Sequence, residues 1–358
     1  MTKGVIPAAC VERRKNFGER KKYKARKIFF KARKKNFCRR KKNTRLPPPP
    51  NLEKKRKYLG KRKFWRTFAT DSGAVARSSS GGSGGKRGRR RKNTRNMKIK
   101  DVVRTLELVA PLPLQEEYDN SGLQIGLTET TVTGVLLCLD VTEPVIQEAV
   151  ERGCNLVVSH HPLLFRGLKQ ISGRNCVERT VQLALKADVA VYSAHTSLDN
   201  ARGGVNYELA ERLGLREVSF LAPRGTAPEE GGSGVIGRLP DEGEAPMDFL
   251  RRLKTLLGAE AVHYACGPQT RLRQIAVCGG AGDFLADAAA AAGADLFLTG
   301  EVGYHRYFGR EQQMWLAEVG HYESEQFTVQ LLHRILAEAF PDVPMWESAT
   351  AVNPRRTL

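Results

Sequence analysis

Two adjacent histidines, His160 and His161, end an apolar run in the stretch VVSHHPLLF. Two later stretches, AHTSLD and GHYESE, each place a histidine four positions before an acid. Imidazole and carboxylate groups bind transition metals, and they also transfer protons at neutral pH. The types and spacing of these residues therefore indicate a metal centre, acid–base chemistry, or both.

The segments around these residues have the patterns of buried strands and amphipathic helices. The runs VTGVLLCLDV and NLVVS are almost continuously apolar, as parallel strands are when both faces of their sheet are covered. Between them, EPVIQEAVERG has helical spacing and ends at Gly153. From Met97 onward the sequence thus predicts an α/β fold.

The same pattern returns later in the chain. RQIAVCGGAGDFLADAAAAAGADLFLTGE again has the pattern of strand, glycine turn, helix and strand, and an offset of 140 residues aligns Cys138 with Cys278. An offset of 126 residues superimposes the two His-x-x-x-acid stretches. We therefore predict two similar α/β lobes that arose by internal duplication and that surround one site.

Changes in composition and pattern divide the chain into four parts. Residues 1–96 form a basic leader, 97–215 the first α/β lobe, 216–270 a linking strand–helix–strand segment, and 271–358 the second α/β lobe. The linking segment contains the Gly- and Pro-rich stretch APRGTAPEEGGSG, which is typical of a loop.

The leader carries the excess positive charge of the chain. Residues 1–96 contain 35 Lys+Arg and 4 Asp+Glu, a net of 35 − 4 = +31, whereas the whole chain, with 59 Lys+Arg and 38 Asp+Glu, is +21. Residues 97–358 therefore carry 24 − 34 = −10. Because dense like charges repel and few apolar residues are periodic, the leader is expected to be disordered.

Three interpretations of the leader remain open. Clustered Lys and Arg with interspersed Phe and Trp could bind nucleic acid by phosphate contacts and base stacking. An Arg-rich, acid-poor segment could also be a targeting peptide, although it has no apolar stretch for secretion. The abrupt change in composition favours the third interpretation, in which translation begins at Met97 and the leader is an artefact of gene prediction. Because the positive charge lies in the leader and residues 97–358 are acidic, nucleic-acid binding is expected only through the leader.

The seven cysteines show no CxxC pair and no regular spacing. Without a secretory signal, this usage predicts a reduced, cytoplasmic protein rather than a disulfide framework. No apolar run is long enough to span a bilayer, so no membrane partner is expected.

Eight candidate residues come directly after predicted strands, where ligands bind in open α/β sheets. They are His160, His161, His195, Asp199, Glu301, His305, His321 and Glu325. If the chain turns at Pro162, the adjacent imidazoles diverge and can serve different metal ions.

Five of these side chains are predicted metal ligands: His160, His161, Asp199, His321 and Glu325. They are too few for two separate four-coordinate shells, so we expect a carboxylate that bridges two ions, with water in the open positions of a catalytic centre. This donor set suits two divalent ions of Zn, Fe, Mn, Ni or Co and does not choose between them.

The other three candidates have weaker assignments. His195 could be a further ligand, a residue that orients a ligand, or a proton-transfer group. Glu301 and His305 are candidate catalytic residues of similar status, with surface helix capping as the alternative. Asp119, in YDNSG, could line the crevice, although an Asx-turn explains it equally well.

These stretches resemble the type 2 homologues of GTP cyclohydrolase I, a family of dinuclear-metal-centre proteins. The resemblance runs from Met97 to about Arg355 and is carried by YDNSGLQIG, SHHPLLF, AHTSLDNARGGVN, LTGEVGYH and GHYESE. It implies paired lobes in a toroidal homohexamer, the same five ligands, and Glu325 as the bridge. Glu301 departs from the Asp that the family usually has at this position.

The leading hypothesis is a dinuclear metal-dependent hydrolase that uses a metal-activated water on a small molecule. In this hypothesis His195 or His305 would move the proton. The resemblance implies a nucleotide substrate and opening of the guanine imidazole ring of GTP. Two alternatives remain: a metal-binding, storage or interaction protein without turnover, and a ring that binds nucleic acid.

Overall fold

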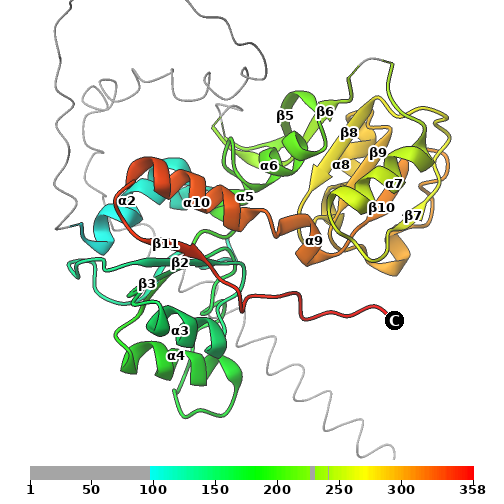
Figure 1. Ribbon diagram of the computed structural model, residues 1–358. Coiled ribbons are helices and arrows are strands. Elements are labelled where there is room, and N and C mark those ends of the chain that lie inside the picture. The colour runs from blue at the N-terminus through cyan, green and yellow to red at the C-terminus, as the bar shows by residue number, and fades with distance from the viewer. Residues whose placement is uncertain (1–96, 226–229, 241) are drawn as a thin grey trace, which may run out of the picture. The chain divides into compact units, whose positions relative to one another are not determined.

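The computed structural model describes residues 97–225, 230–240 and 242–358 (Figure 1). The leader predicted for residues 1–96 lies outside these ranges. Within them the chain forms a mixed α/β structure with two sheets, which confirms the predicted fold class. None of the helices in these ranges is long and apolar enough to cross a membrane.

The first sheet has the strand order β1–β4–β3–β2–β11. Its strands are β1 (Gly122–Ile125), β2 (Val135–Cys138), β3 (Leu156–Ser159), β4 (Ala190–Ser193) and β11 (Met345–Glu347). Strands β4, β3, β2 and β11 run parallel, and β1 pairs with β4 in the antiparallel direction.

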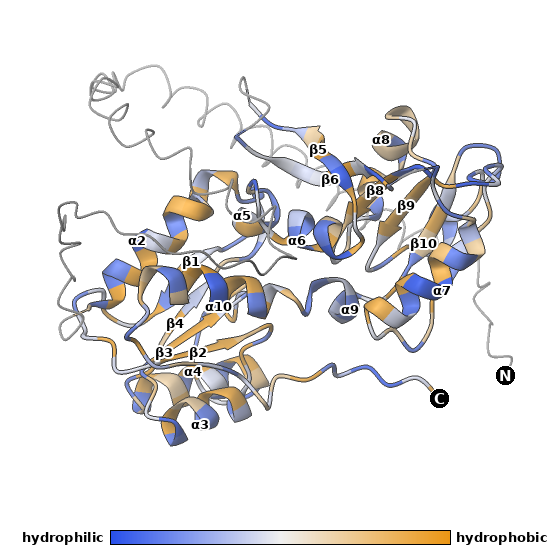
Figure 2. Ribbon diagram, turned by 45° about the horizontal axis from the view of Figure 1, so that its top comes forward, coloured by the Kyte–Doolittle hydropathy of each residue, from blue (hydrophilic) through white to orange (hydrophobic). Residues whose placement is uncertain are grey.

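Helices cover both faces of this sheet (Figure 1). One face packs against α2 (Ile99–Val109) and α10 (Thr328–Ala339), and the other packs against α3 (Glu143–Glu151) and α4 (Cys176–Lys186). All four residues of β2, β3 and β4 are therefore buried, which explains their unbroken apolar runs (Figure 2).

The second sheet has the order β5–β6–β8–β9–β10–β7. Its strands are β5 (Arg216–Pro223), β6 (Gly232–Arg238), β7 (His263–Ala265), β8 (Gln274–Cys278), β9 (Leu296–Thr299) and β10 (Trp315–Glu318). Helices α6 (Val205–Arg212) and α7 (Pro246–Leu256) pack on one face, and α8 (Ala286–Ala291) packs on the other.

Three consecutive parallel strands occur in each sheet, β2–β3–β4 and β8–β9–β10. Their registers agree with the offset of 140 residues, because Cys138 pairs with Ser159 just as Cys278 pairs with Thr299. A common origin of the two lobes stays a prediction that this likeness supports.

The chain returns to the first sheet after it has formed the second. Helix α10 packs in the same apolar cluster as α2, and β11 pairs with β2. The sequence predicted domains at residues 97–215, 216–270 and 271–358, and these ranges do not include the return of the chain to the first sheet. They stay predictions as domain boundaries. The lobe around the second sheet is thus inserted into the lobe around the first.

The stretch HYESEQFTVQLLHRIL, whose spacing predicts one helix, forms two. Helix α9 (His321–Glu325) ends at Gln326, and α10 begins at Thr328. The break redirects the chain from the second lobe to the first, and the ring of Phe327 at this break packs under the guanidinium of Arg212. His321 and Glu325 still share one face because α9 contains both.

Candidate metal centre

The carboxyl ends of the parallel strands bring the predicted ligands together. His160 and His161 directly follow β3, and Asp199 ends the short helix α5 (Thr196–Asp199), which begins three residues after β4. The corresponding short helix in the second lobe, α9, follows β10 and carries His321 and Glu325.

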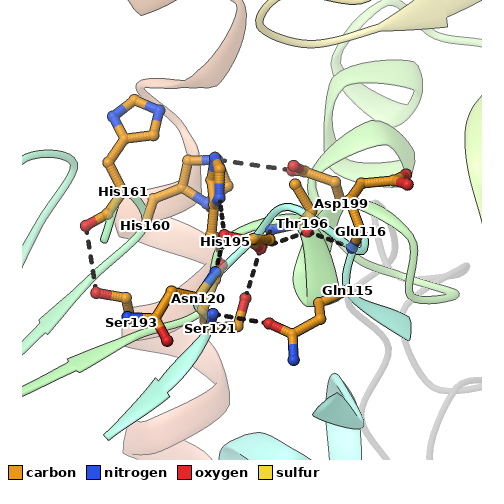
Figure 3. Close-up of polar contacts among 12 residues, drawn as sticks. Gln115, Glu116, Asn120, Ser121, His160, His161, Ser193, His195, Thr196 and Asp199 are labelled. Atoms are coloured by element: carbon orange, nitrogen blue, oxygen red, sulfur yellow. Dashed lines mark hydrogen bonds and ion pairs between the residues drawn. The ribbon is translucent and has the colours of Figure 1, made fainter. Parts of the chain in front are cut away.

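One group of donors consists of His160, Asp199 and Glu325. His160 Nε2 lies 3.6 Å from Asp199 Oδ1, a contact drawn in Figure 3, and 3.7 Å from Glu325 Oε1. His160 Nε2 and Asp199 Oδ1 are both buried without a hydrogen-bond partner among the described residues. Buried polar atoms are rarely left unpaired, so this pair marks a place for a cation.

A second group consists of His161, His321 and Glu325. Glu325 Oε2 lies 3.0 Å from His161 Nε2 and 3.1 Å from His321 Nε2, and the two Nε2 atoms are 3.3 Å apart. Glu325 therefore belongs to both groups, through a different oxygen in each. His160 and His161 thus belong to different groups around Glu325, although a third group joins both of them with His195.

Groups outside the two sets fix the orientation of the rings. His160 Nδ1 lies 3.1 Å from the Ala194 carbonyl oxygen, and His161 Nδ1 lies 2.8 Å from Asp140 Oδ1. When each Nδ1–H donates to these acceptors, both Nε2 atoms face the centre, where each could bind a metal ion once it carries no proton.

The carboxylates have opposite electrostatic environments. Burial, and then the neighbouring Glu325, raise the pKa of Asp199. Burial would also raise the pKa of Glu325, but His160 and hydrogen bonds from His161 hold that pKa well below its usual range. Burial opposes protonation of His161, yet hydrogen bonds to Asp140 and Glu325 raise its pKa to about 10.

Gly280 makes room for the shared carboxylate. Its φ is +60°, and a Cβ at this position would overlap Glu325 Oε1. The glycine turn after β8 therefore lets Glu325 reach both groups.

The two donor groups face a pocket of about 620 Å³ that residues of both lobes line. Six of the eight candidates line it, namely His161, His195, Asp199, Glu301, His321 and Glu325. His160 is fully buried behind this surface.

His195 faces the pocket from the first lobe. Its Nδ1 lies 2.7 Å from Asp119 Oδ1, and Asp119 Oδ2 accepts hydrogen bonds from the backbone N–H of Thr196 at 3.0 Å and from Ser121 Oγ at 2.9 Å. Burial would raise the pKa of Asp119, but its hydrogen bonds with His195 and Thr196 lower it well below the usual range. His195 also lies close enough to His160 and His161 to share a metal ion with them.

Of the two remaining candidates, Glu301 lines the pocket and His305 does not. Glu301 lines the pocket with about half of its side chain exposed, and its Oε1 lies 3.4 Å from His321 Nδ1. His305, in η6 (Tyr304–Arg306), lies edge-on to the ring of Tyr304 and near that of Phe308, and it does not line the pocket. Proton transfer by His305 has no geometric support within the described residues.

Asp140 supports the site and was not assigned from the sequence, whereas Asp119, which was expected to line the crevice or to form an Asx-turn, contacts His195. Asp140 follows β2 by two residues, at the carboxyl end of the run VLLC. The strand-end rule that identified the histidines would also have found it. Asp119 precedes β1 in a turn, and only its contact with His195 distinguishes it from an ordinary Asx-turn.

The sequence of residues 97–354 matches the model of the family Duf34/NIF3 (NGG1p interacting factor 3). A GTP cyclohydrolase 1 type 2 homolog of Clostridium perfringens is 36% identical over 231 residues, which cover 64% of this chain and 87% of that protein. NIF3-like protein 1 of Drosophila melanogaster is 35% identical over 211 residues, 58% of this chain and 70% of that protein.

Solved structures with the same fold include the hypothetical protein SA1388 of Staphylococcus aureus, with a TM-score of 0.67, 25% identity, and coverage of 73% of this chain and 99% of that one. Reduced HcgD of Methanocaldococcus jannaschii has a TM-score of 0.59 and 25% identity, and the match covers 70% of this chain and 97% of that one.

Proposed function

Because the chain belongs to the Duf34/NIF3 family, we propose that it is a hydrolase that depends on two divalent metal ions. The observation that carries this proposal is the position of Glu325, whose two oxygens face two different groups of donors. A carboxylate between two three-donor groups is a typical bridging ligand of a two-metal centre.

The residues present fit such a centre. His160, Asp199 and Glu325 would hold one ion, and His161, His321 and Glu325 the other. Nitrogen and carboxylate oxygen donors suit Zn, Fe, Mn, Ni or Co. Three protein donors for each ion leave positions open toward the pocket, as in catalytic rather than structural sites.

When bound, the two ions would supply a water of lowered pKa and would polarise the substrate bond. The protein residues hold and orient the reacting groups. Asp119 fixes Nδ1 of His195, so that Nε2 of this ring is free to exchange a proton inside the pocket. Glu301 lies against His321 and would orient that ring.

We propose a nucleotide as the substrate, on the basis of the GTP cyclohydrolase 1 type 2 homologs that resemble this chain. Opening of the guanine imidazole ring of GTP is a hydrolysis, and a pocket of about 620 Å³ is large enough for a ligand of this size. We also propose that the protein assembles as a homohexamer and is located in the cytoplasm.

The test is an assay of the metal-loaded chain with GTP, other nucleotides and simple phosphoesters. Mass spectrometry of the products should show hydrolysis that chelation abolishes, and His160→Ala should remove it. If the chain loaded with each of the five candidate metals hydrolyses none of these compounds, the proposal is wrong.

A second candidate is an interaction or metal-carrying protein without turnover, which the description of the family as an interacting factor favours. The same assay separates the two, because this candidate requires bound metal that exchanges readily and no product. Nucleic-acid binding by residues 97–358 is disfavoured by their net charge of 24 − 34 = −10.

A further inference from the structure

The segment after β11, residues 348–358, leaves the first lobe and crosses to the second. We call this segment the C-terminal strap. Figure 1 shows it as the red chain that passes below α9. It contains no helix or strand, so its path depends on contacts with the two lobes.

Glu148 of α3 fastens the beginning of the strap to the first lobe. Its carboxylate accepts hydrogen bonds from Ser348 Oγ at 2.6 Å, from the backbone N–H of Ala349 at 3.1 Å and from Thr350 Oγ1 at 2.9 Å. Such charge-assisted hydrogen bonds are stronger than neutral ones, so the strap starts from a fixed position.

Two acids of the second lobe hold the rest of the strap. Asn353 Nδ2 donates to Glu323 Oε1 at 2.7 Å, and the backbone N–H of Thr357 donates to Glu260 Oε2 at 2.9 Å. Arg355 lies between these two attachments. Its position is therefore set on both sides.

Asn353, Pro354 and Arg355 bring the strap to the wall of the pocket that contains the metal-binding groups. Arg355 is the one Lys or Arg among the described residues that line this pocket. Five acids line it with Arg355: Glu116, Asp140, Asp199, Glu301 and Glu325. Arg355 therefore supplies a positive charge that does not depend on pH to the wall of this pocket.

The guanidinium of Arg355 is exposed, and no carboxylate of the described residues forms an ion pair with it. Other arginines of this chain form ion pairs, such as Arg212 with Glu208 and Arg310 with Asp287. An unpaired guanidinium at the wall of a ligand pocket presents several N–H donors in a plane that matches an oxyanion.

We propose that Arg355 binds an oxyanion of the substrate, which in a nucleotide is a phosphate group, and that the strap thereby selects charged over uncharged substrates. This inference rests on the proposed function, because it takes the pocket to be the substrate site. The guanidinium offers a charge-assisted contact that an anion can make and a neutral nucleoside cannot, so its removal should weaken binding of the anion and have little effect on the nucleoside.

The experiment compares the binding of GTP and guanosine to the metal-loaded full chain by isothermal titration calorimetry. The unaltered chain should bind GTP more tightly. Arg355→Ala should weaken GTP binding about tenfold, the effect expected from loss of a charge-assisted contact, and leave guanosine binding unchanged. Arg355→Lys should restore part of the preference.

The neighbouring Arg356 provides a matched control. It lies on the same strap and lines, together with Arg355, a hollow of about 300 Å³ on the second lobe, but it does not line the pocket of the metal-binding groups, so Arg356→Ala should leave both affinities unchanged. A loss of GTP affinity in both single variants would mean a general charge effect and would overturn the assignment of Arg355.

The outcomes separate this inference from the proposed function. If the unaltered chain does not prefer GTP, or if Arg355→Ala keeps the preference, the inference fails even where hydrolysis is observed. Binding that depends on Arg355 without any hydrolysis supports the inference and contradicts the hydrolase. In a chain that does hydrolyse GTP, Arg355→Ala should raise KM and leave kcat nearly unchanged.

Discussion

Glu325 shows how one side chain can organise a site that two lobes build. It is 5% exposed at the end of α9, and each of its oxygens faces a different donor group. A buried carboxylate keeps its charge only where cations or hydrogen-bond donors surround it. Here imidazoles from both lobes surround it, and metal ions would replace their protons.

Glu325→Ala and His321→Ala should differ in metal content. Glu325 is common to both donor groups, whereas His321 belongs to one. We expect Glu325→Ala to lose both ions and His321→Ala to lose about one, because the group of His160 and Asp199 stays intact. Elemental analysis of the purified proteins measures this, and equal loss in the two variants would contradict a shared carboxylate.

Gly280→Ala tests the space reserved for Glu325. Both Gly280 and Gly293 have a positive φ, but only the Cβ at Gly280 would overlap Glu325, since nothing lies within 4 Å of the Cβ position at Gly293. Each alanine should destabilise the fold by about 1 kcal/mol through its backbone. Only Gly280→Ala should also weaken metal binding in a metal titration, and an unchanged affinity would show that Glu325 does not need this space.

Single residues could be proposed as ligands from the sequence where chemistry and position agreed. The HH pair and the two His-x-x-x-acid stretches combine donor types with strand ends, and the structure brings all five predicted ligands into the two donor groups. His305 has the right chemistry, but its side chain lies with Tyr304 and Phe308 outside the pocket. Sequence spacing does not give the direction of a side chain in a short turn.

Among the elements, buried strands were the easiest to predict. Strands β2, β3 and β4 have helices on both faces, and therefore their apolar runs are unbroken. The division between α9 and α10 was missed, because both helices keep the same apolar spacing and only packing against different lobes separates them. Helix α3, in contrast, has clear ends, with Thr142 as its N-cap and Gly153 after it.

Glu148 of α3 should make the stability of the protein depend on pH. Burial alone would raise its pKa, but hydrogen bonds from Ser348 and its neighbours lower it to about 2, below the ordinary value of 4.5. Because the pKa is lower in the folded state, this stabilisation is complete above about pH 4.5 and is lost as the pH falls toward about 2.

Glu148→Gln should therefore lower the free energy of unfolding by about 1–3 kcal/mol at pH 7. The difference from the unaltered chain should shrink as the pH falls through this window in urea titrations. Glu151→Gln, an exposed change on the same helix, is the control. A difference that stays constant down to pH 2 would mean that the charge of Glu148 does not contribute.

At the scale of the whole molecule, charge separates the chain into two parts. Residues 1–96 carry 35 − 4 = +31 and residues 97–358 carry 24 − 34 = −10. The full chain should bind DNA with an affinity that falls steeply with salt, and residues 97–358 alone should bind little. Fluorescence anisotropy at several salt concentrations measures both, and equal binding by the two would place the DNA site in residues 97–358.

The two-lobed arrangement could be predicted because the repeated strand–helix–strand pattern recurs at a fixed offset. The return of the chain to the first lobe through α10 and β11 could not be predicted, because no local sequence pattern indicates which sheet a strand near the end of the chain joins. Strand β11 is only three residues long, and its partner β2 lies about 200 residues earlier in the chain. Its place depends on long-range packing.

The position of β11 near the end of the chain sets the order in which the two sheets can be completed during translation. The inserted lobe has all of its strands once Glu318 has been synthesised, whereas the sheet that carries His160 and His161 lacks an edge until Glu347 has followed. Nascent chains would expose the unpaired side of β2 throughout that interval, a state prone to wrong pairing. A chaperone that binds the nascent chain during this stage would therefore reduce wrong pairing at β2.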